Sequence, residues 1–148
     1  MTIRTALPLD HPRIVSVADT WWGRPVAGAL PRLFLDHFHK TSFIGEVDKE
    51  LIGFVVGFVS PSNLDEAYIH FVGVHPRHRR SGLARALYER FFDLAGAQGR
   101  TRVIAITPSI NTTSIGFHRA IGFDVSEPVD DYDGFGVAQI VFRRKLER

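Results

Sequence analysis

An arginine cluster at a strand-to-helix junction is the feature of this chain that bears most directly on chemistry. Residues 72–87 read V-G-V-H-P-R-H-R-R-S-G-L-A-R-A-L: an apolar strand, a proline, three arginines, then a glycine that opens a helix. The N-terminus of a helix presents unpaired N–H groups and about half a positive charge. Gly82 lets the backbone approach a ligand without a Cβ in the way. The pattern therefore predicts an anion site that would suit a phosphate.

This segment resembles the acyl-CoA-binding motif of the GNAT N-acetyltransferase superfamily, whose R/Q-x-x-G-x-G/A core is matched by Arg79, Gly82 and Ala84. The resemblance implies that acetyl-CoA is bound, with Val72 and Val74 offering backbone groups to its pantetheine arm. The positions implied to hold its pyrophosphate are Arg79, Arg80, Ser81, Gly82, Leu83 and Ala84. The segment matches neither a Walker loop nor a G-x-G-x-x-G dinucleotide motif. A solvated turn before an ordinary surface helix is the alternative interpretation.

A second match lies downstream, in the order that the family requires. Residues 111–123, N-T-T-S-I-G-F-H-R-A-I-G-F, resemble the N-x-x-A-I-x-L-Y-x-x-L-G-F segment of the same superfamily. Asn111 is a residue type that caps helices, and Gly122 is one that ends them in the left-handed conformation. The resemblance adds Asn111, Ser114 and Phe117 to the expected acetyl-CoA contacts. With two motifs in the right order, the chain is identified as a member of this superfamily.

The implied reaction is attack of a primary amine on the thioester, which requires proton removal, carbonyl polarisation and protonation of the leaving thiolate. Strand alternation puts Glu66, Tyr68 and His70 on one face, with Tyr68 where the family often has a glutamate. His70 is the first candidate for the base and Glu66 the second; a core role for His70 is equally open. A backbone amide at Val72 or its neighbour would polarise the carbonyl. His118 stands where relatives carry an acidic tyrosine, and it either protonates the thiolate or only packs.

Two groups of residues are candidates for binding the amine. Trp21 and Trp22 end the first predicted helix, where the family builds part of its acceptor pocket; as core or surface aromatics they would need no such role. Asp131 and Tyr132 belong to an acidic loop, residues 130–133, that would attract a cation. A plain turn is the alternative for this loop.

Composition limits the class of protein. The chain has 148 residues, 45% hydrophobic and 23% charged, which indicates a single globular domain spanning 1–148. A net charge of +2 does not mark a nucleic-acid binder, and no apolar run approaches the ~20 residues of a membrane span. The start of the sequence lacks a secretory pattern, so a cytoplasmic location is expected. No metal is expected, because cysteine is absent and His37 and His39 point in different directions on a helix.

Hydrophobic periodicity predicts the elements that position these residues. Strands are expected at 2–6, 42–47, 51–60, 67–74, 103–107, 123–125 and 137–146, and helices from 8, from 30, from 82 to about 95, and from 111. The pattern alone indicates an α/β or α+β chain. The order β-α-α-β-β-β-α-β-α-β-β is that of the GNAT fold. The resemblance therefore implies a mixed, mostly antiparallel, splayed sheet with helices on both faces, in which the pantetheine arm pairs with strand backbone.

The sequence thus predicts an acetyl-CoA-dependent N-acetyltransferase that acts by direct attack of a primary amine, with a small molecule as the expected acceptor. A protein or peptide acceptor would need an open groove rather than an enclosed pocket, and the sequence does not separate the two. A non-catalytic CoA-binding module is favoured by the missing strand glutamate, and a nucleic-acid module by the arginine cluster. No nucleic-acid or membrane partner is expected, and a homodimer is left open.

Overall fold

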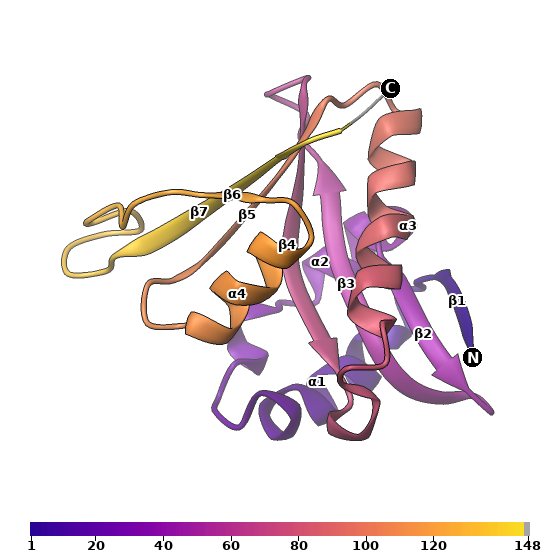
Figure 1. Ribbon diagram of the computed structural model, residues 1–148. Helices are drawn as coiled ribbons and strands as arrows, with labels where there is room; N and C mark the ends of the chain where they lie inside the picture. The colour runs from indigo at the N-terminus through magenta and orange to yellow at the C-terminus, as the bar shows by residue number, and fades with distance from the viewer. Residues whose placement is uncertain (147–148) are drawn as a thin grey trace. The chain divides into compact units, whose positions relative to one another are not determined.

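The computed structural model describes residues 1–146, and its elements follow the predicted order (Figure 1). The elements are β1 (Thr2–Thr5), α1 (Asp10–Trp22), α2 (Leu33–Phe38), β2 (Phe43–Val47), β3 (Glu50–Val59), β4 (Glu66–Val74), α3 (Leu83–Ala97), β5 (Arg102–Pro108), α4 (Thr112–Ala120), β6 (Asp124–Val125) and β7 (Gln139–Lys145). Short 3-10 helices lie at Ala27–Ala29, His39–Thr41 and Pro76–His78. The strand order is β1-β2-β3-β4-β5-β7-β6. The predicted mixed, mostly antiparallel sheet is confirmed.

The start of α2 differs from the prediction. The helix expected from Leu30 begins at Leu33, and Leu30 closes a 3-10 turn with its N–H donating to the carbonyl of Ala27 at 3.0 Å. Leu30 has φ −120° and ψ 74°, which is outside the helical region. The residue before a proline is disfavoured in the helical conformation, and here that proline is Pro31.

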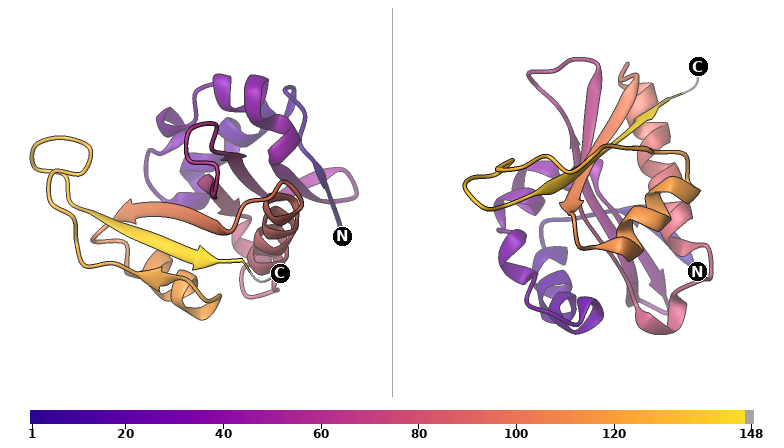
Figure 2. Two further views of the ribbon diagram at one scale, coloured as in Figure 1. Left: turned by 90° about the horizontal axis from the view of Figure 1, so that it is seen from above. Right: turned by 60° about the vertical axis from the view of Figure 1, so that its left-hand side comes forward.

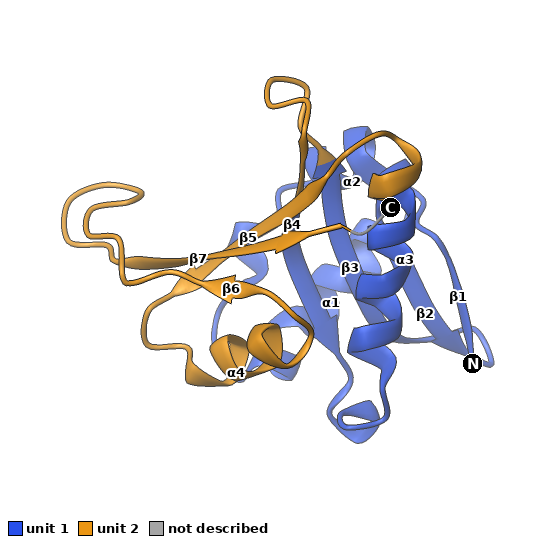
Figure 3. Ribbon diagram, turned by 45° about the horizontal axis from the view of Figure 1, so that its top comes forward, with its two compact units in different colours: residues 1–58, 69–94 blue, residues 59–68, 95–148 orange. Residues whose placement is uncertain are grey.

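The chain is built as two compact units (Figure 3). Unit 1 comprises residues 1–58 and 69–94, and unit 2 comprises residues 59–68 and the chain from Ala95 onward. Since the chain passes between the units at 58/59, 68/69 and 94/95, neither unit is a continuous stretch of sequence. The single domain expected from the length stays a prediction, and the two units are described separately below.

In unit 1, helices cover both faces of the central strands (Figures 1 and 2). One face packs against α1 and α2 in a core that includes Ile14, Ala18 and Leu35 from the helices and Phe54 from β3. All residues from Leu51 to Gly57 on β3 are buried, as expected for a strand covered on both faces. The strand is therefore a rigid support for its neighbour β4.

The other face of unit 1 carries α3, and two glycines set how closely it approaches. A Cβ on Gly45 would lie 3.2 Å from a methyl of Leu83, and a Cβ on Gly53 would lie 2.8 Å from the other methyl of the same leucine. Leu87 lies 3.2 Å from that second position. Glycines on β2 and β3 therefore let the first turn of α3 dock directly on the strands, which fixes the start of this helix.

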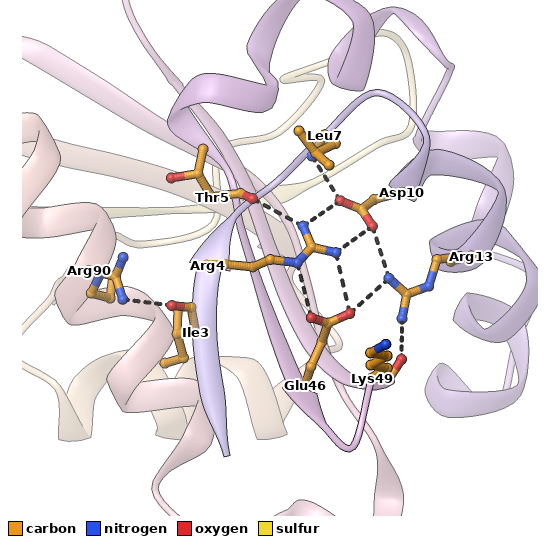
Figure 4. Close-up of polar contacts among 9 residues, drawn as sticks. All are labelled: Ile3, Arg4, Thr5, Leu7, Asp10, Arg13, Glu46, Lys49 and Arg90. Atoms are coloured by element: carbon orange, nitrogen blue, oxygen red, sulfur yellow. Dashed lines mark hydrogen bonds and ion pairs between the residues drawn. The ribbon is translucent and has the colours of Figure 1, made fainter.

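A cluster of four charged side chains ties β1, α1 and β2 together (Figure 4). We call Arg4, Asp10, Arg13 and Glu46 the N-terminal ion cluster. Arg4 donates to both Asp10 carboxylate oxygens at 2.9 Å and to Glu46 at 3.0 Å, and Arg13 donates to both acids at 3.0 Å. The N–H of Leu7 donates a further hydrogen bond to Asp10 at 2.8 Å. Each charge in the cluster is thereby matched by an opposite one.

Unit 2 is organised around an antiparallel pair. Strands β5 and β7 pair along their length, from Arg102 opposite Lys145 to Pro108 opposite Gln139, and β6 pairs with the other edge of β7. The prediction that Asn111 caps the following helix is confirmed, because its Oδ1 accepts from the N–H of Ser114 at 3.2 Å. Gly122 has φ +92° directly after the helix, as expected for a left-handed end.

Candidate active site

The residues of the first motif form a turn between β4 and α3 in unit 1. We call Arg79–Gly82 the motif turn. All four residues are exposed, Arg80 has φ +62° and Gly82 has φ +85°. A Cβ built on Gly82 meets no atom within 4 Å. The glycine is therefore required by the backbone conformation and by whatever approaches from solvent, not by packing against the protein.

The backbone of the motif turn presents donors to solvent. Within residues 1–146, the N–H groups of Arg80, Ser81 and Gly82 donate no hydrogen bond to the chain. The first N–H groups of α3 have no acceptor within the helix either, and that of Leu83 only reaches Ser81 Oγ at 3.4 Å. Left-handed residues next to a helix start direct successive N–H groups into a concavity that binds anions. These features would suit a pyrophosphate, and the pyrophosphate contacts stay a prediction.

The side chain of Arg79 is turned towards α1. Its guanidinium donates to the carbonyl oxygen of Trp21, at the end of that helix. Trp21 is buried, stacks on Phe54 at 5.9 Å between ring centroids, and lines a cavity of about 310 Å³. The lining residues are Arg13, Ser16, Val17, Trp21, Glu50, Leu51 and His75. Trp21 thus packs in the core while its backbone anchors the motif turn.

Trp22 lies on β4. Its Nε1–H donates to the carbonyl oxygen of Val72 at 3.1 Å, its ring stacks on Phe71 at 5.7 Å, and Arg24 lies 5.4 Å from its ring centroid. The Val72 carbonyl, predicted for the pantetheine arm, is therefore already an acceptor for the indole. A carbonyl oxygen has a second lone pair, so the bond does not exclude a ligand donor. The backbone of Val74 is placed at the end of the same strand.

His70 has a geometry that suits a base. Its Nε2 lies 2.6 Å from the carbonyl oxygen of Ala29, which can only accept, so the ring proton is on Nε2 and Nδ1 keeps its lone pair. The ring stacks on Phe34 at 4.0 Å with the two planes parallel. Burial lowers the pKa of His70, and the bond to Ala29 opposes that shift. The imidazole is consequently neutral near pH 7 and held in one orientation.

The other two candidates on β4 belong to unit 2. Glu66 accepts from Arg102 Nε at 2.9 Å and from Asn63 Nδ2 at 3.3 Å, so its carboxylate is held in an ion pair. Tyr68 is half-buried. Burial raises its pKa, and Tyr132 and Asp133 raise it further. Tyr68 therefore keeps its proton through the neutral range, and the charge of Asp133 contributes to the raised pKa.

His118 is buried within unit 2. Its ring stacks on Phe142 at 4.0 Å with an interplanar angle of 5°, and its Nδ1–H donates to the carbonyl of Ser114 at 2.7 Å. Phe117, half-buried beside it, meets the imidazole edge-on at 5.4 Å. Burial lowers the pKa of His118 to about 4. A neutral ring with its Nδ1 proton committed is poorly suited to the acid role predicted for it, and packing is the interpretation that this geometry favours.

The acidic loop forms the ordered end of the β6–β7 hairpin. Asp131 Oδ1 accepts from the N–H of Gly136 at 2.7 Å, so this carboxylate closes the hairpin, and the side chain of Tyr132 is exposed. Asp133 Oδ2 accepts from Gln139 Nε2 at 3.0 Å. The sequence placed Asp133 in the acidic loop together with Asp131 and Tyr132, but it did not point to Gln139. No local pattern marks Gln139, because its partner lies across the hairpin.

Two features are absent from the part of the chain that the structure describes. Residues 1–146 contain no group of three His, Cys, Asp or Glu side chains placed to hold a metal ion. No helix among the same residues is long and apolar enough to cross a membrane.

Several known proteins are similar to this chain in sequence or in fold. The profile of the acetyltransferase (GNAT) family matches residues 12–123. L-2,4-diaminobutyric acid acetyltransferase of Nocardia farcinica is 29% identical over 89 residues, which are 60% of this chain and 46% of that protein. The chain therefore spans about half the length of this curated relative.

Solved structures extend the similarity to the whole fold. Ard1 from Thermoplasma volcanium superposes with a TM-score of 0.84 at 24% identity, covering 99% of this chain and 98% of that one. YncA from Salmonella typhimurium, solved with its cofactor acetyl-CoA, gives a TM-score of 0.78 at 20% identity, covering 100% of this chain and 95% of that one. At these identities the likeness establishes the fold alone.

Proposed function

Because this chain belongs to the GNAT acetyltransferase family, we propose that it is an acetyl-CoA-dependent N-acetyltransferase whose acceptor is a primary amine on a small molecule. The motif turn carries this proposal: it is exposed, it has a left-handed glycine with open space around it, and its N–H groups have no acceptor in the described chain. The Nocardia farcinica relative, which is named for a small diamino acid, supports a small acceptor.

Acetyl-CoA supplies the acetyl thioester when it is bound. The motif turn and the N-terminus of α3 hold the pyrophosphate through backbone N–H groups. Arg79 shapes this site rather than pairing with a phosphate, because its guanidinium is bonded to the carbonyl of Trp21. Arg80, whose side chain is exposed, adds positive charge near the phosphates.

His70 is the base in this proposal. A protonated amine is not a nucleophile, so its proton must be removed before it attacks the thioester. The free lone pair on Nδ1 takes that proton directly or through a water, while the Nε2–H bond to Ala29 holds the ring in place. Glu66 is less suited, since Arg102 stabilises its charged form through a short ion pair. Tyr68 stays protonated in the neutral range, but burial raises its pKa and makes it a weaker acid, so it is no better suited than solvent to protonate the leaving thiolate.

A screen of amines tests the proposal. Acetyl-CoA is incubated with the full chain and a panel of diamines, amino acids, aminoglycosides and short peptides, and release of CoA thiol is followed. Turnover of small amines with little turnover of peptides supports the proposal. A preference for peptides would make the acceptor a protein, and an acetyl-CoA melting shift without turnover of any amine would indicate a CoA-binding module.

The role of His70 has its own test. His70→Phe keeps a ring beside Phe34 and removes the base, so kcat should fall about 100-fold, the lower end of what general base catalysis contributes, while the acetyl-CoA melting shift stays. His11→Phe is the matched control, because His11 Nε2 bonds a backbone carbonyl, that of Leu30, at 2.9 Å. If both variants keep wild-type kcat, the base is another group or solvent.

A further inference from the structure

The last turn of α1, in unit 1, carries a negative charge where a helix disfavours one. Asp19 lies in this turn, and the turn contains no basic residue. The C-terminal end of a helix bears about half a negative charge, so a carboxylate there is destabilising unless it makes a compensating contact. Asp19 is exposed, and its contacts are with the segment that follows the helix. Its position therefore points to a role in holding that segment.

The segment after the helix comprises residues 23–29, and we call it the α1 loop. Asp19 Oδ1 accepts from the N–H of Val26 and from the N–H of Ala27, both at 2.7 Å. These bonds, the one from Ala27 first, hold the pKa of Asp19 below its ordinary value. The side chain is therefore a carboxylate near pH 7, and a charged acceptor makes the stronger hydrogen bond.

The same loop presents the carbonyl that bonds His70. Ala27–Ala29 form a 3-10 turn in which the N–H of Ala29 donates to the carbonyl of Val26 at 2.9 Å. The carbonyl of Ala29 in turn accepts from His70 Nε2 at 2.6 Å. Within residues 1–146, Asp19 and His70 are the only side chains that bond the backbone of the α1 loop. A continuous set of hydrogen bonds thus connects the carboxylate to the imidazole.

The residue after the loop is fixed in a different way. Leu30 is 1% exposed in the core, so its side chain holds it in place, and its carbonyl accepts from His11 Nε2 at 2.9 Å. Ala29 is exposed and has only a methyl group, so it has no comparable anchor of its own. The position of the Ala29 carbonyl therefore depends on Asp19 more than on His11.

We propose that Asp19 is a positioning residue for His70: its carboxylate holds the α1 loop so that the carbonyl of Ala29 keeps the imidazole proton on Nε2. For its effect on catalysis the inference rests on the proposed function, in which the lone pair on Nδ1 takes the proton of the amine. The ring is oriented by two contacts, the bond to Ala29 and the stack on Phe34. Loss of Asp19 removes the support of the first contact and leaves the second.

NMR of the full chain, labelled with 15N-histidine, tests the arrangement without requiring turnover. His70→Phe identifies the ring N–H signal of His70. We expect this Nε2–H to be protected from exchange with water in the wild type and to exchange at least tenfold faster in Asp19→Ala, which should fold because Asp19 is exposed and alanine favours helices. Asp19→Asn keeps an oxygen acceptor at similar volume and should restore most of the protection. The inference is wrong if the wild type shows no protected signal, or if folded Asp19→Ala retains it.

Two control variants separate this role from a general loss of stability. His11→Phe removes the bond to Leu30, and Asp93→Ala removes an exposed carboxylate from α3; both should leave the His70 signal unchanged. If either control matches Asp19→Ala, the effect is not specific to Asp19 and the inference fails.

Activity then separates the inference from the proposed function. Asp19→Ala should lower kcat about tenfold, Asp19→Asn should recover most of that loss, and both should retain the acetyl-CoA melting shift. Faster exchange of the His70 proton with an unchanged kcat would overturn the role of His70 as the base and leave its positioning by Asp19 standing. A lower kcat with the His70 signal unchanged would overturn the positioning and leave the proposed function standing.

Discussion

Unit 1 has two arginine-rich regions, and they differ in whether their hydrogen-bond donors have acceptors within the protein. In the N-terminal ion cluster, each arginine is paired with two carboxylates at about 3 Å, and Asp10 is almost fully buried. In the motif turn, the arginines are exposed, Arg79 bonds a backbone carbonyl, and the backbone N–H groups find no acceptor within residues 1–146. Arginine content alone therefore does not mark an anion site. What indicates an anion site is a set of backbone N–H donors for which the described chain supplies no acceptor.

The largest effect should come from closing the motif turn to anions. Gly82→Asp places a carboxylate at the expected pyrophosphate position, and we expect acetyl-CoA affinity to fall more than 100-fold. Ligand at a hundred times Kd stabilises the wild type by about 2.7 kcal/mol, so the melting shift should vanish in the variant. Gly82→Asn is the control, because asparagine also tolerates φ near +85° but carries no charge. An unchanged melting shift in Gly82→Asp would mean that the turn is not the anion site.

Substitutions in the N-terminal ion cluster should lower the free energy of unfolding and leave the affinity for acetyl-CoA unchanged. Asp10→Asn leaves Arg4 without its bidentate partner, and we expect a loss of about 2–3 kcal/mol, below the 3–5 typical of deeply buried pairs because Arg4 is one-third exposed. Asp36→Asn, in the exposed pair with Arg32, should cost only about 0.3 kcal/mol. Urea unfolding at pH 7 measures both. A weakened acetyl-CoA affinity in a folded Asp10→Asn protein would break the distinction between the two regions.

The same cluster sets a direction for acid sensitivity. Burial alone would raise the pKa of Asp10, but the hydrogen bonds from Arg4, Leu7 and Arg13 outweigh it and hold the pKa below its ordinary value. Arg4 chiefly lowers the pKa of Glu46 in the same way. The stabilisation is therefore complete above the unfolded-state pKa, about 4, and is lost as the pH falls through the lower folded values. Asp10→Asn should lose less stability than the wild type between pH 5 and pH 2.

His118 gives a second pH window and separates packing from catalysis. Its folded pKa, about 4, lies below the ordinary 6.5, so the unfolded state binds the extra proton first. Stability should fall by up to about 3 kcal/mol as the pH drops from 6.5 to 4. His118→Phe keeps the ring on Phe142 and should abolish this part of the pH dependence, with kcat within threefold of wild type. A tenfold or larger fall in kcat in a folded His118→Phe variant would support the acid role after all. His37→Phe is the control, because His37 is exposed.

Local sequence signals predicted the parts of the fold that local physics determines. The cap at Asn111 and the left-handed Gly122 both follow from residue type at the end of a helix. The motif turn was found in the same way, from a glycine and arginines at a helix start. These features depend on residues within a few positions of one another, which is why one sequence is enough to find them.

What the sequence did not predict depends on partners far apart in the chain. The indole of Trp22 bonds the carbonyl of Val72, fifty residues away. The sequence left both a catalytic and a packing role open for His70 and for His118, and their surroundings separate the two residues. Among the described residues, His70 keeps one ring nitrogen without a partner, whereas His118 is packed on Phe142. Burial and hydrogen-bond partners determine these roles, and neither is encoded in the neighbouring residues.

The smallest expected effect comes from replacing Arg80. It tests whether backbone amides or arginine side chains contribute more to acetyl-CoA binding at the motif turn. Arg80 adopts φ +62°, which costs a residue with a Cβ about 1–2 kcal/mol, whereas glycine adopts it freely at an entropic cost of about 1 kcal/mol. Arg80→Gly should therefore raise the free energy of unfolding by about 0.5 kcal/mol. It should lower the affinity for acetyl-CoA less than tenfold, because one exposed cation contributes at most about 1 kcal/mol.

Arg77→Gly is the matched control for that variant. It removes the same charge from the preceding 3-10 helix, where φ is not positive, so it should weaken acetyl-CoA to a similar extent but lower stability. Melting temperatures with and without acetyl-CoA, at two salt concentrations, measure both quantities. If Arg80→Gly weakens binding a hundredfold and Arg77→Gly does not, the Arg80 side chain holds the ligand directly. In that case the unpaired amides would not be what distinguishes the motif turn from the N-terminal ion cluster.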